Sequence, residues 1–271
     1  MKRIIRKIIN AAGFDLVKRR SLLEANLNID ERLGYEWEDE ATECIHMVKG
    51  NTMLSKRRLV TLYQQVAYCE TQEIQGSFVE CGVWKGGAVG LMALANLRQG
   101  KQRRHLHLFD AFQEICEPDA AVDGARALRE VRELTGRSGL EHGRLQALTG
   151  IYDGMGGPGT LDENQRLLEG VIGYPKAFVH YHVGWFQNTI PSEHQDIGPI
   201  AILRLDGDWY ASTKICLEYL FDKVVRGGVV IIDDYGTYEG CRRAVDEFIK
   251  LNRIQVYLAP IDRDCRFFVN Q

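Results

Sequence analysis

The sequence predicts an α/β protein whose core is a doubly wound, mostly parallel sheet with an antiparallel strand pair at its C-terminal end. Short apolar runs alternate with segments of helical periodicity between residues 77 and 251. This alternation is typical of a parallel sheet covered by helices on both faces. Two of the runs, at 200–205 and 228–232, are almost continuously apolar, as expected for central strands. Together these observations indicate a Rossmann-like arrangement.

The chain of 271 residues fits one large domain with a helical flank. Residues 1–75 are interpreted as an N-terminal helical lid or flank, because apolar residues recur at helical spacing within 55–71. Residues 76–271 are expected to hold the sheet. Residues 1–18 mix basic and apolar side chains and predict a basic amphipathic helix that packs on the domain or on a second subunit. Attachment of this helix to a membrane surface is the alternative.

The first elements of the main domain follow a strand, turn, helix, strand order. Residues 77–80 predict a short strand, and 81–87 predict a glycine-containing turn. The Ala- and Leu-rich stretch 88–97 predicts a helix, and the next strand, 105–109, runs directly into Asp110. Strand, glycine turn and helix in this order form the unit that binds nucleotides in doubly wound sheets.

A long polar stretch separates the second strand from the third. Residues 111–176 carry helical patches at 125–133 and 161–170 and are interpreted as a substrate-recognition insertion, since loops of this length are usually functional. The remaining elements then restore the alternation. They are strands at 177–182, 200–205 and 228–232, helices at 212–225 and 239–251, and an antiparallel pair at 254–258 and 266–269 around a turn at 260–264.

Composition excludes several classes of protein. The net charge of −3 gives no basic field for a phosphate backbone, so nucleic acid is not an expected partner. The seven cysteines are scattered without a CxxC pair, which favours reduced thiols in the cytoplasm. No apolar run approaches the roughly 20 residues of a membrane span. We expect a cytoplasmic homo-oligomer that acts on a small molecule.

The first turn and the second strand end predict a nucleoside site. Glycines stand at Gly82, Gly86 and Gly87 after Glu80, a spacing that differs from the GxGxxG pattern of dinucleotide enzymes. This difference disfavours a nicotinamide-dependent oxidoreductase and suits a nucleoside without a pyrophosphate. Asp110 is placed to accept hydrogen bonds from ribose hydroxyls. An ordinary tight turn with a helix cap at Asp110 is the alternative.

Further acids follow the two central strands. Asp206 comes after 200–205, and Asp233 and Asp234 come after 228–232, so the sheet brings three carboxylates together. Such carboxylates repel one another unless a cation lies between them, and oxygen ligands favour Mg²⁺, Mn²⁺ or Ca²⁺. Asp208 lies two residues past Asp206 and is predicted to be a general base. A metal ligand or a cap of the following helix are its alternatives.

Five segments together resemble the macrocin O-methyltransferase family, which includes tylosin-, mycinamicin- and novobiocin-type sugar methyltransferases. They run in the family's order through about four-fifths of the chain. The segments are GSFVECGVWKGG at 76–87, LFDAF at 108–112, GWFQNTIP at 184–191, LDGDWYAST at 205–213 and IDDYG at 232–236.

The resemblance implies a class I methyltransferase fold, S-adenosylmethionine as methyl donor and a magnesium ion. It implies that the ion is held by the positions of Asp206, Asp233 and Asp234, with Asp208 as the base. It further implies a set of residues that contact the donor or line its pocket. These are Thr52, Met53, Glu80, Gly82, Gly86, Asp110, Trp185 and Phe186.

The expected acceptor is a hydroxyl of a sugar or glycosylated natural product. Where the family usually reads close to FDSFEGLP, this chain reads FDAFQEIC at 109–116, so the resemblance does not fix the acceptor. A catechol or another vicinal diol would suit the same metal chemistry. A non-catalytic nucleoside-binding scaffold is a further alternative, which the retention of all four Asp residues at the strand ends disfavours.

Overall fold

A computed structural model describes residues 27–271, and the helix expected at residues 1–18 lies outside them. The described helices are α3 (Glu38–Val48), α4 (Lys56–Thr71), α5 (Gly87–Gln99), α6 (Gly124–Thr135), α7 (Leu161–Gln165), α8 (Phe186–Glu193), α9 (Tyr210–Leu220) and α10 (Glu239–Leu251). The strands are β1 (Ser77–Cys81), β2 (Leu106–Asp110), β3 (Val179–Val183), β4 (Ile200–Leu205), β5 (Val224–Ile232), β6 (Ala259–Pro260) and β7 (Arg266–Val269).

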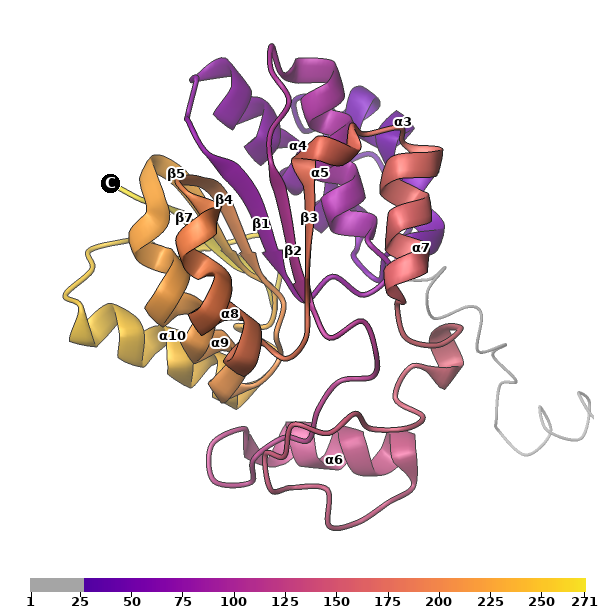
Figure 1. Cartoon of the computed structure of the whole chain (residues 1–271), viewed down its shortest axis with the longest axis vertical. Helices are drawn as coiled ribbons and strands as arrows, with labels where there is room; N and C mark the ends of the chain where they lie inside the picture. Colours follow the sequence, from indigo (N-terminus) through magenta and orange to yellow (C-terminus); the bar gives the residue numbers. More distant parts are fainter. Residues whose placement is uncertain (1–26) are drawn as a thin grey trace, which may run out of the picture.

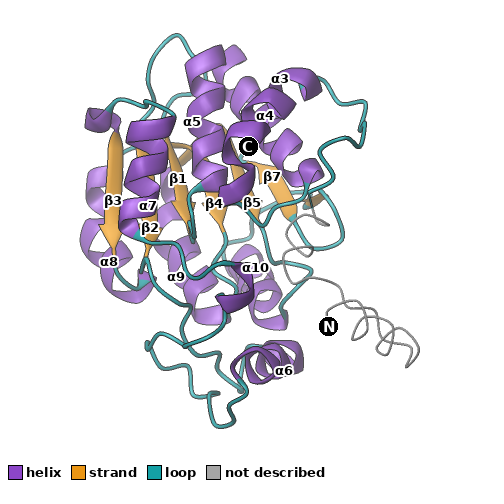
Figure 2. Ribbon diagram, turned by 90° about the vertical axis from the view of Figure 1, so that its right-hand side faces the viewer, coloured by secondary structure: helices purple, strands orange, loops and turns teal. Residues whose placement is uncertain are grey.

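The strands form one seven-stranded sheet in the order β3-β2-β1-β4-β5-β7-β6. The pairs from β3 to β5 are parallel, and β7 runs antiparallel to β5 and β6. Helices α3, α4 and α5 cover one face, and α8, α9 and α10 cover the other (Figures 1 and 2). This confirms the predicted doubly wound α/β fold with an antiparallel C-terminal pair.

The strand order places a ligand crevice between β1 and β4. The chain proceeds outward from β1 to β2 and β3 on one side, and then to β4 and β5 on the other. Ligands of doubly wound sheets bind beyond the carboxyl ends of the strands at such a reversal. Cys81 pairs with both Phe109 and Leu205, and Leu205 pairs with Ile232. The loops after these strands therefore start at the same edge of the sheet.

Apolar packing on both faces explains why the central strands lack polar alternation. Phe78 and Ile202 contribute to the core under α4 and α5, whereas their neighbours Val79 and Leu203 contribute to the core under α9 and α10. Successive side chains of a strand point to opposite faces, so a strand covered on both sides is apolar throughout. All seven cysteines are free and buried. Among the described residues, every helix is too short or too polar to cross a bilayer.

The insertion lies below the carboxyl edge of the sheet (Figure 1). The Ala127 and Val131 side chains of α6 pack in a small, separate hydrophobic core. Trp209, from the segment after β4, belongs to the same core. Helix α7 continues as a π-helix at Arg166–Val171, whose Leu167 and Leu168 join the core of the α5 face. The insertion therefore packs against the segment after β4 through α6 and against the α5 face through the π-helix.

One predicted strand is wrong, and two predicted boundaries are shifted. The strand expected at 254–258 is irregular, and the partner of β7 is the two-residue β6 instead. The apolar Val256 and Leu258 pack against the α9/α10 core rather than pairing with β7, which accounts for their alternation. The helix expected at 212–225 ends at Leu220, and β5 starts at Val224 instead of residue 228.

Helices α3 and α8 were not predicted. Helix α3 is anchored by Glu38, a buried acid whose carboxylate accepts hydrogen bonds from the Leu33 and Gly34 amides and pairs with buried Lys56. Helix α8 is short and contains Pro191, which breaks the usual helical signal. The Glu38–Lys56 pair joins α3 to α4, and α8 packs against α9 and β2, so both helices are held by other elements of the fold.

A buried histidine predicts acid sensitivity of the fold. Burial, with His180 and His182 beside it, lowers the pKa of His107 from 6.5 to about 3. Below pH 6.5 the unfolded chain binds a proton that the folded chain does not, so the free energy of unfolding decreases as pH falls toward 3. We expect a loss of about 1.4 kcal/mol per pH unit from this group.

Urea unfolding at pH 7 and pH 5 measures this effect. The decrease between the two pH values should be smaller by about 2 kcal/mol in His107→Gln than in the wild type. His46→Gln, on the exposed face of α3, is the control and should keep the wild-type decrease. Equal decreases in His107→Gln and wild type would contradict the assignment.

Candidate active site

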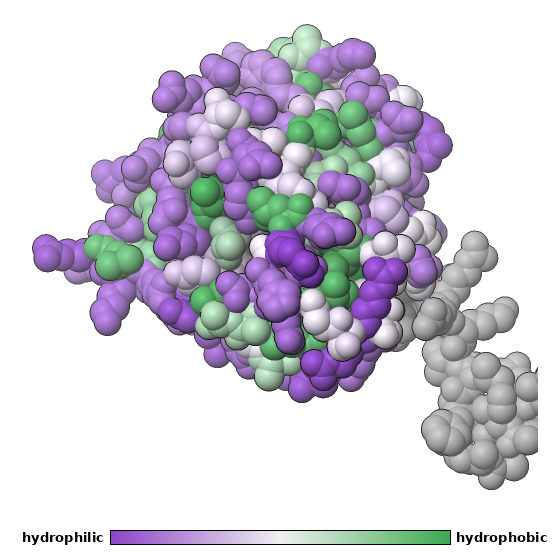
Figure 3. Space-filling view, turned by 60° about the horizontal axis from the view of Figure 1, so that its bottom comes forward, coloured by the Kyte–Doolittle hydropathy of each residue, from purple (hydrophilic) through white to green (hydrophobic). Residues whose placement is uncertain are grey.

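A cavity of about 310 Å³ opens at the carboxyl edge of the sheet, between the strand ends and the insertion. Seven of the predicted site residues line it: Met53 comes from the loop before α4, and the others come from the end of β2 or from the segments after β1, β3 and β4. They are Met53, Gly82, Asp110, Trp185, Phe186, Asp206 and Asp208. In the view of the molecule's lower side, hydrophobic side chains are visible among a mostly hydrophilic surface (Figure 3). The predicted strand-end site is therefore a real concavity.

The first turn needs glycine because it presses against the loop after β4. Gly82 has φ +93°, and a Cβ there would lie 1.8 Å from the Asp206 carbonyl oxygen. Asp110 fixes the same turn, because its Oδ2 accepts hydrogen bonds from the Val83 and Trp84 amides at 2.6 and 3.1 Å. Burial raises the pKa of Asp110, and these amides oppose the rise. The Asp110 carboxylate is therefore held in place by the turn and lines the cavity at the end of β2.

Three predicted donor residues lie outside the cavity lining. Glu80 is 1% exposed, and its Oε1 accepts a hydrogen bond from Arg204 at 2.6 Å. Gly86 is the N-cap of α5 and packs against Asn164 of the insertion. The Thr52 hydroxyl accepts a hydrogen bond from the Leu54 amide at 3.1 Å. These contacts support the turns around the cavity.

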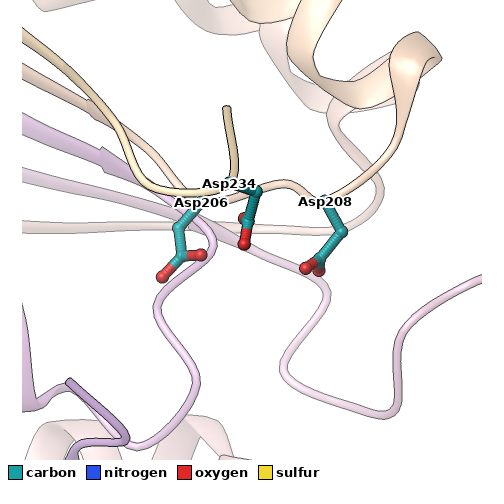
Figure 4. A group of neighbouring side chains, drawn as sticks. All are labelled: Asp206, Asp208 and Asp234. Carbon is teal, nitrogen blue, oxygen red and sulfur yellow. The ribbon is translucent and has the colours of Figure 1, made fainter. Parts of the chain in front are cut away.

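The acids after β4 and β5 gather in a set that differs from the predicted one. Asp206, Asp208 and Asp234 each offer a carboxylate oxygen within 4.8 Å of the others. Figure 4 shows the three carboxylates directed to the same side. Asp233 belongs elsewhere, because its oxygens accept hydrogen bonds from Arg204 at 2.7 Å and from Arg58 at 2.5 Å. Consecutive residues at a strand end point in opposite directions, so Asp233 and Asp234 separate.

The cluster has the chemistry of a cation site. The Oδ2 atom of Asp234 is buried and has no hydrogen-bond partner among residues 27–271. Burial raises the pKa of Asp234, and the nearby Asp208 and Asp206 raise it further. Burial and then Asp206 likewise raise the pKa of Asp208. Oxygen ligands whose charges repel in this way fit a hard divalent cation.

Two arginines that sequence reasoning missed, one buried and one partly buried, neutralise acids around the cluster. Arg204 is 2% exposed and donates from Nη1 to Glu80 and to Asp206 Oδ2, the latter at 2.8 Å. Arg58, from the start of α4, bridges Asp233 and Asp262. The sequence signal that could have revealed Arg204 is its place as a charged residue inside the apolar run 200–205. A buried charge of this kind requires a partner nearby.

Asp208 lines the cavity, and its backbone has an unusual conformation. Its φ of +58° is a left-handed conformation, which costs energy in residues other than glycine. The residues that follow it are fixed by the insertion: the Trp209 ring nitrogen donates to the Cys116 carbonyl at 3.0 Å, and the Tyr210 amide donates to Asp123 at 2.6 Å. Helix α9 is therefore not capped by Asp208.

The side of the cavity away from β1 is formed by the insertion and the start of α10. Val131, Leu134 and Ile151 provide apolar lining there. Glu130 and Tyr238 provide a polar pair in the same wall, in which the Tyr238 hydroxyl donates to Glu130 at 3.1 Å. Such a mixture suits a ligand with both hydroxyl groups and apolar surface.

A family comparison matches most of the chain. The model of the family described as "Macrocin-O-methyltransferase (TylF)" matches residues 19–138 and 170–270. The gap between the two matched parts falls within the insertion. The match includes the glycine turn and all the acids described above.

Curated relatives and solved structures agree with this match. The demethyldecarbamoylnovobiocin O-methyltransferase of Streptomyces niveus is 34% identical over 217 residues, covering 79% of this chain and 74% of the relative. A tetracenomycin 4'-O-methyltransferase of Streptomyces olivaceus that acts on a dimethoxyrhamnosyl derivative is 31% identical, covering 80% and 70%. The solved O-methyltransferase NovP is 30% identical with a TM-score of 0.65, covering 82% of each chain. The calicheamicin methyltransferase CalS11, at 17% identity and a TM-score of 0.54, shares the fold.

Proposed function

Because the chain belongs to the macrocin O-methyltransferase family, we propose that it transfers a methyl group from S-adenosylmethionine to a sugar hydroxyl of a glycosylated natural product, assisted by a divalent cation. The observation that carries the proposal is a cavity lined by Asp110, a nucleoside-type acid, and by Asp206 and Asp208, whose carboxylate oxygens lie within 4.8 Å of one from Asp234. A methyl donor and the acceptor hydroxyl would meet in that space.

The donor is proposed to bind at the β1–β2 side of the cavity. Asp110 would accept hydrogen bonds from the ribose hydroxyls. Met53 and Phe186 would cover the apolar parts of the nucleoside, and Gly82 would let the backbone approach closely. Methyl transfer is an in-line displacement in which alignment supplies much of the acceleration, so these residues act by positioning.

Asp206 and Asp234 are proposed to hold the cation. Mg²⁺ is usually bound through one or two carboxylates, with waters and substrate oxygens completing its coordination. Asp233 is left out of the proposed set, because both of its oxygens are bonded to arginines. A bound cation supplies polarisation of the acceptor hydroxyl, which lowers the pKa of that hydroxyl.

Asp208 is proposed to remove the proton of the acceptor hydroxyl. It lines the cavity, and its oxygen lies within 4.8 Å of the proposed cation ligands. Burial removes solvent from this carboxylate, which favours its uptake of a proton. The proton passes to Asp208 as the acceptor oxygen bonds to the methyl carbon and the carbon–sulfur bond breaks.

The acceptor is proposed to lie against the insertion. Glu130 and Tyr238 would bond to sugar hydroxyls, while Val131, Leu134 and Ile151 would cover the scaffold that carries the sugar. The novobiocin and tetracenomycin relatives are named for methylation of glycosylated compounds, which supports this class of acceptor.

Calorimetry with S-adenosylhomocysteine tests the donor site. We expect the wild type to bind it and Asp110→Ala to bind it about 10- to 100-fold more weakly, since charge-assisted hydrogen bonds are lost. Ser192→Ala, on the surface of α8, is the control and should bind as the wild type does. Binding of NAD or ATP without binding of either S-adenosyl compound would refute the proposed donor.

A further inference from the structure

Arg204 joins two acids to which the sequence analysis gave separate roles. Its Nη1 atom donates one hydrogen bond to Glu80 at 2.6 Å and another to Asp206 Oδ2 at 2.8 Å. Its Nη2 atom donates to Asp233 at 2.7 Å. Arg204 and Glu80 are 2% and 1% exposed, so solvent screens these contacts little. The predicted donor residue and the proposed cation ligand therefore share one guanidinium.

This contact leaves one side of Asp206 open to a cation. Oδ2 of Asp206 is occupied by Arg204, and Oδ1 accepts no hydrogen bond from residues 27–271. Partners that bond to the second atom of a metal ligand orient it, and their loss typically weakens metal binding 10- to 100-fold. The planar guanidinium group of arginine suits this orienting role, because it can donate hydrogen bonds to several carboxylates in fixed directions.

Glu80 and Asp233 keep the arginine from repelling the cation. An isolated guanidinium beside a cation site would oppose cation binding. Here Arg204 forms ion pairs with Glu80 and with Asp233, and Asp233 forms a second ion pair with Arg58. Glu80 does not line the cavity, so it contacts Arg204 and not a ligand in that cavity.

We propose that Arg204 is a positioning residue that holds Asp206 for cation binding, and that Glu80 serves the cation site through Arg204 instead of contacting the methyl donor. The inference rests on the cation site of the proposed function. It assigns Glu80 a role different from the one implied by the family resemblance. It also separates the effects expected on cation binding from those on donor binding.

Arg204→Lys tests the orienting role, because lysine keeps the positive charge but lacks the planar guanidinium group. Mn²⁺ is the probe, and its affinity is measured by the electron paramagnetic resonance of free Mn²⁺. We expect the affinity to fall about 10- to 100-fold, with the affinity for S-adenosylhomocysteine unchanged by calorimetry. The matched control is Arg104→Lys, which disturbs a partly buried Arg104–Glu70 pair before β2 and should leave Mn²⁺ affinity unchanged.

Glu80→Gln tests the charge-balancing role and remains informative if Arg204→Lys does not fold. Glutamine can still accept the hydrogen bond from Arg204, but the negative charge is gone. We expect Mn²⁺ affinity to fall about tenfold with unchanged affinity for S-adenosylhomocysteine. A fall in S-adenosylhomocysteine affinity with unchanged Mn²⁺ affinity would show that Glu80 contacts the donor, and would overturn the inference.

The outcomes separate this inference from the proposed function. If the wild type binds Mn²⁺ and both variants bind it equally well, the inference is overturned and the cation site stands. If the wild type binds no Mn²⁺, the cation site itself is refuted, and the inference fails with it. Reduced Mn²⁺ affinity in Arg104→Lys would indicate a general loss of packing and would also overturn the inference.

Discussion

Asp208→Asn is expected to lower kcat by about 10²–10⁴-fold, the usual range for loss of a positioned acid or base. Asparagine has nearly the same shape and tolerates the left-handed conformation that Asp208 adopts, so the backbone should remain in place. It cannot accept the proton of the acceptor. The affinities for S-adenosylhomocysteine and Mn²⁺ should therefore stay close to those of the wild type.

Measuring kcat and Mn²⁺ affinity on this variant distinguishes two roles. A general base gives a large loss of kcat with unchanged Mn²⁺ affinity. A metal ligand gives weaker Mn²⁺ binding and a rate partly restored by added metal. Asp222→Asn, at an exposed position after α9, is the control, and unchanged kcat in Asp208→Asn would rule out the base.

The double variant Asp206→Asn, Asp234→Asn is expected to lose about 10³-fold or more of the activity, because Lewis-acid assistance contributes several kcal/mol. Each substitution removes the charge of a proposed cation ligand while keeping the shape of the side chain. Mn²⁺ binding should be lost together with the activity, and S-adenosylhomocysteine binding should be retained. Excess chelator should reduce the wild type to a similar rate.

Asp233→Asn is the matched comparison for the cation ligands. It removes the charge that pairs with Arg58 and Arg204, so we expect a loss of about 3–5 kcal/mol in the free energy of unfolding, typical of a broken buried ion pair. Mn²⁺ should still bind at saturating metal.

Full turnover of the double variant Asp206→Asn, Asp234→Asn, or of the wild type in chelator, would remove the cation from the mechanism.

Much of the fold follows from periodicity in the sequence. Strand β4 and helix α10 begin and end where predicted, at 200–205 and 239–251, because a continuous apolar run and a strongly amphipathic segment are clear signals. The segment 254–258 misled the prediction because its alternating apolar residues pack on a core without pairing to a strand. Periodicity reveals which side chains are buried, but not which backbone groups are paired.

The same distinction limits what the sequence says about the site. Strand ends at one edge of a parallel sheet bring acids together, so Asp110, Asp206 and Asp208 were predicted in the cavity that they line. The direction of each acid depends on partners that are distant in the chain. Asp233 turns toward Arg58, which lies 175 residues away, and a sequence pattern cannot show such a contact.

A methyl-transfer assay with labelled S-adenosylmethionine tests the central claim most directly. The acceptors are rhamnosides, other deoxysugar glycosides, oligosaccharides and catechols, each with Mg²⁺ and with excess EDTA. We predict that label is transferred to a sugar hydroxyl of a glycoside, and that EDTA strongly reduces the transfer. Transfer to catechols alone, equal transfer in EDTA, or no transfer to any hydroxyl would contradict the account.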